Sequence, residues 1–140
     1  MEVTNRNRWA AKFMASRKIR PKRSHCPIAS WLDVFGDKWT LVIVRDLMAG
    51  KRRYNDFLDS PEGIPTNILA DRLKRLEAQG IVTRERYLER PPRYEYILTR
   101  RGAELIPALQ AIAGWGREHV LRAWETPDWF DTAKPETFAP

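Results

Sequence analysis

The spacing of apolar residues predicts two helices where the regular part of the chain begins. Pro27 suits the first position of a helix, which makes Cys26 the expected N-cap. Apolar residues then recur at spacings of three and four, at Ile28, Trp31, Leu32 and Phe35. Asp37 is expected to cap a second helix, in which most residues from Trp39 to Met48 are apolar. A helix that is apolar on most sides belongs at the centre of a domain.

The next stretch predicts a short helix, a turn and a longer helix. Residues 52–60 place apolar side chains on one face of a helix of about two turns, namely Tyr54, Phe57 and Leu58. Residues 61–65 are expected to form a turn, because their glycine and two prolines resist helix continuation. Residues 66–79 then predict a helix that ends at Gly80 and directs four side chains inward: Ile68, Leu69, Leu73 and Leu76.

After Gly80 the pattern changes from a helical period to alternation. The segments IVTRERYL and RYEYILT predict two antiparallel strands, and the loop ERPPR joins them because Pro91 and Pro92 cannot continue a ladder. Thr99 is expected to cap a long last helix that reaches about Trp124, kinked at Pro107 unless that residue lies in the first turn.

Three helices followed by a β-hairpin are the parts of a winged helix-turn-helix. The expected fold class is therefore mostly α with a small β-hairpin (α+β). We divide the chain into a basic N-terminal extension (1–24), a winged helix-turn-helix domain (25–124) and an irregular C-terminal tail (125–140). In the extension, Trp9 and Phe13 stand four residues apart, so a short docking helix and a disordered arm both fit.

Positive charge gathers in two parts of the chain. The net charge is +7, and residues 1–24 carry eight basic side chains against Glu2 alone. The remainder balances at zero, with a basic excess between Gly50 and Arg101. This distribution suits a polyanionic partner, although a solvated tail and an ordinary mixed surface would look the same from charge alone.

In a winged helix-turn-helix, these charges would lie where they can contact DNA. The third helix can enter a major groove, while the hairpin loop reaches the adjacent backbone or minor groove. We therefore expect DNA contacts from nine residues: Arg53, Thr66, Asn67, Asp71, Arg72, Lys74, Arg75, Arg90 and Arg93. The alternative is a solvated amphipathic helix in which Arg72 and Arg75 pair with Glu77 or Asp71.

Several motifs together resemble the HxlR-type winged helix-turn-helix transcriptional regulators. They are the Cys-Pro start, GDKWTLVIVRDL, GIPTNILADRLKRLEAQGIV, RPPRYEYILTRRG and GWG, between Cys26 and about His119. The resemblance implies a DNA-binding regulator, with TNILADRLKRLEAQG as recognition helix and ERPPR as wing tip. Relatives often regulate their own or neighbouring genes. A serine that often caps this helix in relatives is Pro65 here, so the cap is expected at Thr66.

The resemblance also implies a homodimer built by the first and last helices. These helices carry more apolar side chains than one small core can cover. The expected interface residues are Trp31, Leu32, Phe35, Leu109, Ile112 and Trp115.

Cys26 is a candidate redox sensor, because several relatives respond to electrophiles, quinones or oxidants and the sensing cysteine sits at this position. A helix N-terminus and the neighbouring Lys22, Arg23 and His25 favour the thiolate. The alternative is a cap-position thiol that senses nothing. We expect no metal site, because His25, Cys26 and His119 lack the spacing and number of ligands within one chain.

The remaining features limit the other function classes. No phosphate-binding loop, nucleophile elbow or paired-carboxylate motif points to an enzyme or to a cofactor. A single cysteine fits a reducing compartment, and no apolar run suggests a signal peptide or membrane span, so we expect a cytoplasmic protein. The expected partners are a double-stranded DNA operator, a second copy and a small-molecule or electrophile effector. A protein-interaction module and a regulator that senses a non-covalent ligand at the dimer interface are the alternatives.

Overall fold

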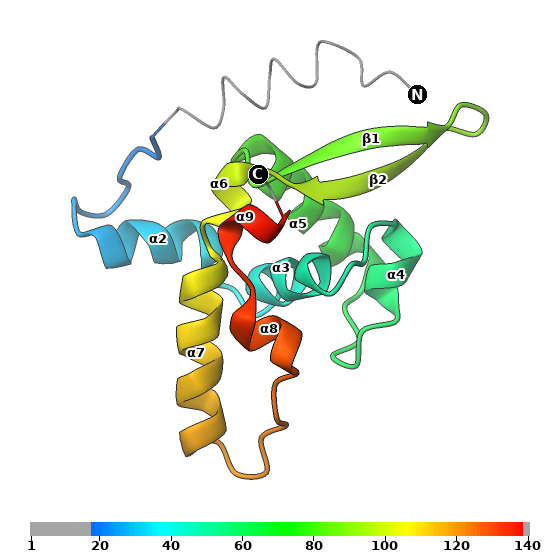
Figure 1. Ribbon diagram of the computed structural model, residues 1–140. Coiled ribbons are helices and arrows are strands. Elements are labelled where there is room, and N and C mark those ends of the chain that lie inside the picture. Colours follow the sequence, from blue (N-terminus) through cyan, green and yellow to red (C-terminus); the bar gives the residue numbers. More distant parts are fainter. Residues whose placement is uncertain (1–17, 139–140) are drawn as a thin grey trace.

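The structure, a computed structural model, describes residues 18–138 and confirms a mainly helical chain with one antiparallel hairpin (Figure 1). In chain order its elements are α2 (Pro27–Phe35), α3 (Thr40–Met48), α4 (Tyr54–Leu58), α5 (Thr66–Ala78), β1 (Val82–Leu88), β2 (Arg93–Leu98), α6 (Arg100–Ala103), α7 (Ile106–His119), α8 (Asp128–Thr132) and α9 (Pro135–Phe138). Most of the basic extension, including Trp9 and Phe13, lies outside the described residues.

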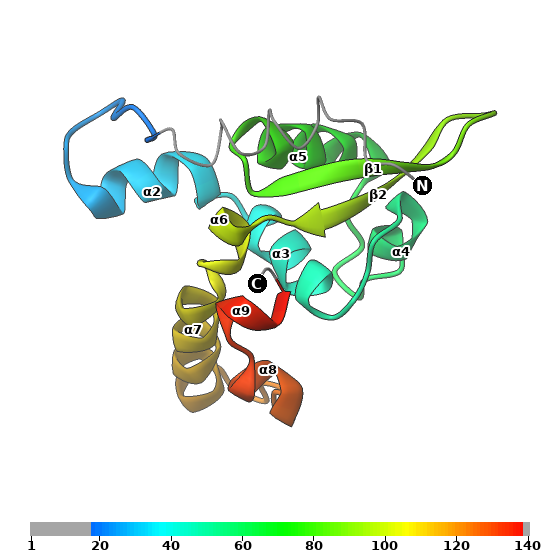
Figure 2. The same ribbon diagram turned by 45° about the horizontal axis from the view of Figure 1, so that its top comes forward.

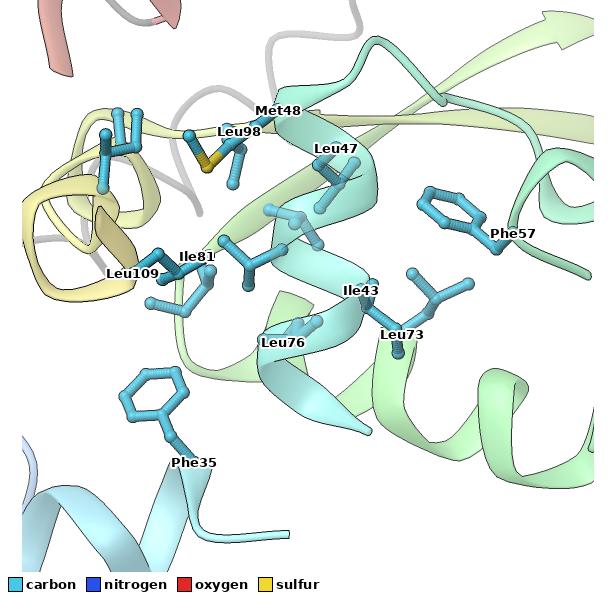
Figure 3. Packing of buried hydrophobic residues seen from close by; sticks show 14 of the residues in the cluster. Phe35, Ile43, Leu47, Met48, Phe57, Leu73, Leu76, Ile81, Leu98 and Leu109 are labelled. Carbon is cyan, nitrogen blue, oxygen red and sulfur yellow. The ribbon is translucent and has the colours of Figure 1, made fainter. Parts of the chain in front are cut away.

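Helix α3 is the central element, as its apolar sequence predicts. Ile43 and Val44 are almost fully buried. Figure 3 shows α3 surrounded by apolar side chains from the neighbouring elements, among them Phe35, Phe57, Leu73, Leu76 and Leu109. Each such side chain contributes about 1.5–3 kcal/mol when it leaves water. The views in Figures 1 and 2 both place α3 between α5 and the C-terminal helices.

The predicted hairpin is confirmed, and the segment before α4 also pairs with it. Strands β1 and β2 pair from Val82–Leu98 outward to Leu88–Arg93, with an irregularity near the tip. The Tyr96 amide donates to the Arg52 carbonyl at 2.7 Å, and Arg53 forms a bridge with Glu95. The segment before α4 therefore lies along the outer edge of β2, which ties the hairpin to the start of the helix-turn-helix.

The prediction of one continuous last helix was wrong. The chain forms α6 after the Thr99 cap, which accepts a hydrogen bond from the Gly102 amide at 3.0 Å, and then breaks before α7. Pro107 lies in the first turn of α7, where its missing N–H costs nothing, but its ring would clash with a continuing helix. Helix α7 ends at His119 rather than near Trp124.

The close approach of α6 to the end of α5 depends on a glycine. A Cβ atom at position 102 would lie 2.2 Å from the Ile81 carbonyl oxygen, a distance that no side chain tolerates. The Thr99 amide donates to that same carbonyl at 3.0 Å. Gly102 thus lets the base of the hairpin pack directly against α6.

The C-terminal tail, expected to be irregular, instead forms α8 and α9. Phe130 is only 6% exposed and joins the core, and the Gln110 side chain donates to the carbonyls of Phe130 and Ala133 at 2.9 and 2.8 Å. Arg100 pairs with Glu136 at 3.1 Å. The sequence signal was weak because both helices are shorter than two turns and prolines precede them. Among residues 18–138, no helix has the length and apolar character needed to cross a membrane.

Candidate nucleic-acid interface

Helix α5 presents the polar face expected of a recognition helix. Leu69, Leu73 and Leu76 are buried and hold it against the core. Thr66, Asn67, Asp71, Lys74 and Arg75 are exposed along the opposite side. The expected cap at Thr66 was wrong by one residue: Pro65 occupies the N-cap position, without a side-chain hydrogen bond, and Thr66 is the first helical residue.

The turn before α5 is fixed to α3 by a charge cluster around the buried Asp46. Asp46 is 4% exposed and accepts a short hydrogen bond from the Ser60 hydroxyl. Arg45 donates through both terminal nitrogens to Glu62 at 2.7 Å, and Lys51 donates to Ser60 at 2.8 Å. The Arg45 hydrogen bonds lower the pKa of Glu62 despite its partial burial. The cluster therefore sets where α5 begins.

Three of the expected DNA-binding residues on α5 are engaged with one another or with the segment before α3. The Arg72 side chain is 18% exposed, lies 3.1 Å from Asp37 and also bonds to Asp71. Arg75 lies 3.8 Å from Asp71. The pairing of Arg72 and Arg75 with Asp71, given above as an alternative to DNA contact, is therefore present. Glu77 pairs with Arg84 of β1 instead. Arg72 connects the recognition helix to the start of α3 rather than facing outward.

Asn67 and Lys74 are expected DNA-binding residues of α5 whose side chains are exposed and unpaired among the described residues. Within residues 18–138 neither side chain forms a hydrogen bond, ion pair or ring contact. Both are exposed, Asn67 in the first turn of α5 and Lys74 two turns later. Their polar atoms are free to meet base edges in a major groove.

The hairpin tip presents cations, as expected. Arg90 and Arg93 are exposed, and in the described part of the chain neither has an ion-pair partner. The tip reaches away from the helices (Figure 2). Arg53, at the N-cap of α4, lies against the same hairpin: its guanidinium lies 4.0 Å from the Tyr87 ring centre, and its Nε lies 3.2 Å from Glu95.

Two further cations lie on the hairpin and were not among the expected DNA-binding residues. The guanidiniums of Arg84 and Arg86 lie 4.3 and 5.5 Å from the ring centre of Tyr94. Arg86 also donates to the Tyr94 hydroxyl at 3.0 Å and pairs with Glu89. The period-two spacing of arginines 84 and 86 along β1 was the available signal, since alternate residues share one face of a strand.

The described part of the N-terminal extension adds basic charge beside α5. A cavity of about 390 Å³ lies between residues 18–22, α2 and the C-terminal half of α5. Six cationic side chains line it: Lys18, Arg20, Lys22, Arg72, Arg75 and Arg101. Asp33 is the one carboxylate among the lining residues and pairs with Arg23 at 2.8 Å. The described part of the N-terminal extension and α5 thus form one basic region.

The expected dimer residues divide into two groups. Leu32, Ile112 and Trp115 are 46%, 53% and 66% exposed, and Trp31 is partly buried. Phe35 and Leu109 lie in the core of the single chain, at 4% and 6%, so their placement at an interface is corrected. Both side chains face the core, because α2 and α7 also pack against α3. The spacing of apolar residues along a helix does not show this.

Cys26 lies at the N-cap of α2, as predicted, and its thiol is exposed. Its side chain makes no cap hydrogen bond, while its amide donates to the Ser24 hydroxyl at 3.3 Å. Arg23, expected beside the thiol, is directed to Asp33 and the Ala29 carbonyl. Among residues 18–138, no group of three or more His, Cys, Asp or Glu side chains could hold a metal ion.

Comparison with known proteins identifies relatives of this arrangement. Residues 34–123 match the HxlR-like helix-turn-helix family. The chain is 37% identical over 112 residues to YybR of Bacillus subtilis, an uncharacterised HTH-type transcriptional regulator; the match covers 79% of this chain and 90% of YybR.

Two solved structures are similar in both sequence and fold. The crystal structure of PA1607, a putative transcription factor, is 39% identical with a TM-score of 0.65, and the match covers 76% of this chain and 73% of PA1607. The redox regulator HypR in its oxidised form is 38% identical with a TM-score of 0.61, and the match covers 67% of this chain and 97% of HypR.

The Asp37–Arg72 contact generates a prediction about stability. Burial alone raises the pKa of Asp37, but hydrogen bonds from Thr40, the Trp39 amide and Arg72 outweigh it and lower the pKa to about 2. We expect Asp37→Asn to reduce the free energy of unfolding at pH 7 by about 1–2 kcal/mol, a value discounted for solvent screening. A lowered pKa stabilises the folded state above the unfolded value of 3.8, so this difference should vanish as the pH falls towards 2.

Urea unfolding at a series of pH values measures this effect. Asp71→Asn is the matched control, because the Asp71 carboxylate is 55% exposed and also pairs with Arg72. It should change the free energy of unfolding by less than about 0.5 kcal/mol. A pH-independent loss in Asp37→Asn would show that the carboxylate charge does not stabilise the junction of α3 and α5.

Proposed function

The chain belongs to the HxlR-like helix-turn-helix family and is a transcriptional regulator rather than an enzyme, and from this we propose that it binds a specific DNA operator as a homodimer. The observation that carries the proposal is the exposed face of α5, where Asn67 and Lys74 stand without partners among the described residues beside a hairpin tip with two unpaired arginines. Acting on chromosomal DNA, the protein would work in the cytoplasm.

The two basic surfaces suit different parts of a duplex. Asn67 and Lys74 face base edges, because an asparagine pairs with adenine and a lysine with guanine in the major groove. Arg90 and Arg93 meet phosphate or the adjacent minor groove. Lys18, Arg20 and Lys22 extend the same charge beside α5, and the basic residues before them add to the non-specific attraction.

A homodimer would cover the apolar side chains that one chain leaves in water. Leu32 on α2 and Trp115 on α7 are 46% and 66% exposed, and Ile28 is 71% exposed. Exposed apolar patches of this kind mark interaction sites. A two-fold dimer also suits operators whose half-sites lie about 34 Å apart, one turn of DNA.

A second proposal concerns oxidant or electrophile sensing through Cys26. It is supported by the exposure of the thiol at the start of α2 and by the likeness to HypR, a redox regulator. The chain has one cysteine, so oxidation can yield only an intersubunit disulfide, a mixed disulfide or an adduct. Each would alter the helix proposed to form the dimer, and with it the spacing of the recognition helices.

The DNA proposal is tested first by selecting duplexes from a randomised pool. We expect Asn67→Ala to weaken binding to the selected duplex by about 1–3 kcal/mol with little change on random DNA, as a lost base contact should. Arg93→Ala should weaken binding to both and reduce the salt slope by about one. Fluorescence anisotropy at several salt concentrations measures both quantities.

The matched control for the hairpin is Arg122→Ala, an exposed arginine beyond α7. It should bind both duplexes like the wild type. Equal loss on selected and random DNA in Asn67→Ala would contradict the assignment of α5 as the reader. Binding that does not respond to salt would favour a protein-interaction module.

The dimer proposal predicts the effect of a charge in the apolar patch. Leu32→Glu should convert a dimer into a monomer at micromolar concentration, because a carboxylate would lose its hydration in an apolar interface. Leu88→Glu, at 41% exposure on the hairpin, is the matched control and should stay dimeric. Analytical ultracentrifugation measures the mass, and a monomeric wild type would refute the proposal.

The sensing proposal predicts a loss of response in Cys26→Ser. This variant should bind the selected duplex normally and ignore diamide or a quinone, whereas the wild type should change its affinity after the same treatment. Alkylation of the thiol across a pH series measures the fraction present as thiolate. A wild type that also ignores the oxidant would leave Cys26 as a helix cap only.

A further inference from the structure

A second cavity, remote from the proposed DNA-binding face, lies between α3, α7 and the start of the tail. Its volume is about 510 Å³, within the range of small-molecule sites. Its walls are mainly apolar and aromatic: Val42 from α3, Ile112 from α7, and Trp124, Trp129 and Phe130 from the tail. Three aromatic side chains on one wall suit a flat, apolar ligand.

The tail wall of this cavity is held in place by specific contacts. Arg117 of α7 lies 2.9 Å from Asp131, and the Thr126 hydroxyl donates to the same carboxylate at 2.8 Å. Phe130 is anchored in the core, and Gln110 donates to its carbonyl. The segment 124–130 lies just beyond residue 123, where the family match ends. One wall of the cavity is therefore built by a part of the chain outside that match.

The one cation among the lining residues is already paired, which argues against an anionic ligand. Arg45 and Asp46 contribute to the lining, but Arg45 is paired with both Glu62 and Asp46, and Asp46 also accepts from Ser60. An anionic ligand would lose its hydration without gaining a free counter-charge, and the Glu125 carboxylate in the same lining would repel it. Trp124 and Trp129, at 77% and 45% exposure, instead offer apolar surface that a neutral ligand would cover.

The same wall is connected to the turn that precedes the recognition helix. Pro61 lines the cavity, and its neighbour Glu62 is held by two hydrogen bonds of 2.7 Å from Arg45. Asp46 binds Ser60 on the other side of Pro61. A ligand that displaces Arg45 or Pro61 would therefore act directly on the turn at residues 61–65 and on the start of α5.

We propose that this cavity binds a neutral, mainly aromatic small molecule, and that its occupation changes DNA affinity through Arg45 and the turn at residues 61–65. The binding site stands on the geometry of the cavity. The effect on DNA rests on the proposed function.

Binding is tested with a matched pair of fluorescent probes, neutral N-phenyl-1-naphthylamine and anionic 1-anilinonaphthalene-8-sulfonate. We expect the neutral probe to saturate at one site per chain and to bind about tenfold more tightly than the anionic one, since no free cation faces it. Trp129→Ala should weaken the neutral probe about tenfold through the loss of an aromatic contact. Leu121→Ala, at 88% exposure outside the cavity lining, is the control and should leave binding unchanged.

Three results would overturn the binding site. They are non-saturable binding, equal affinity for the anionic probe, and wild-type affinity in both Trp129→Ala and Val42→Phe, the latter of which narrows the cavity from α3. Circular dichroism melting confirms that the variants are folded. The monomeric Leu32→Glu variant should still bind the probe; if it does not, the probe occupies the interface between two copies and the assignment fails.

The coupling is tested separately on the duplex selected from the randomised pool. Saturating neutral probe should change the affinity of the wild type for this duplex at least about threefold, a coupling within the ordinary allosteric range. Glu62→Gln should bind the probe normally but lose most of this change. An unchanged wild-type affinity overturns the regulatory step while the probe site stands, whereas absence of any DNA binding contradicts the proposed function instead.

Discussion

The arrangement of the helix-turn-helix depends on a carboxylate that α3 buries. Asp46 lies at 4% exposure in a helix whose neighbours are apolar, and leaving such a group without partners would cost about 3–5 kcal/mol. Ser60 and Arg45 meet this requirement, and Arg45 in turn holds Glu62. Because Ser60 precedes the turn before α5 and Glu62 lies within it, satisfying one buried charge also fixes where α5 starts.

A second electrostatic contact holds α5 further along its length. Asp37 accepts hydrogen bonds from the amides at the start of α3 and also meets Arg72 of α5. Asp37 thus binds both the first amides of the central helix α3 and Arg72 of α5. With α5 held at its start by the turn and along its length by Arg72, its outer face can present Asn67 and Lys74 without loss of order, which is the condition for reading bases accurately.

Much of this could be predicted from the sequence, because the determining patterns are local. Helix periodicity identified α2 to α5, Pro91 and Pro92 identified the hairpin loop, and Thr99 marked the cap of α6. What failed depends on contacts between distant residues. Arg72 looked like a DNA contact, because nothing local shows that Asp37, 35 positions earlier, lies beside it. Phe35 and Leu109 looked like interface residues because an apolar stripe does not say which side of it meets the core.

The tail has a consequence for how such a regulator diverges. Residues 124–130 shape one wall of the apolar cavity, whereas α5 and the hairpin lie on the other side of α3 (Figure 1). Mutations in the tail therefore change the chemistry of the cavity without altering any side chain that would face DNA. Duplicated genes could keep one operator and acquire different inducers, or the reverse, since the two specificities are encoded in separate segments of a short chain.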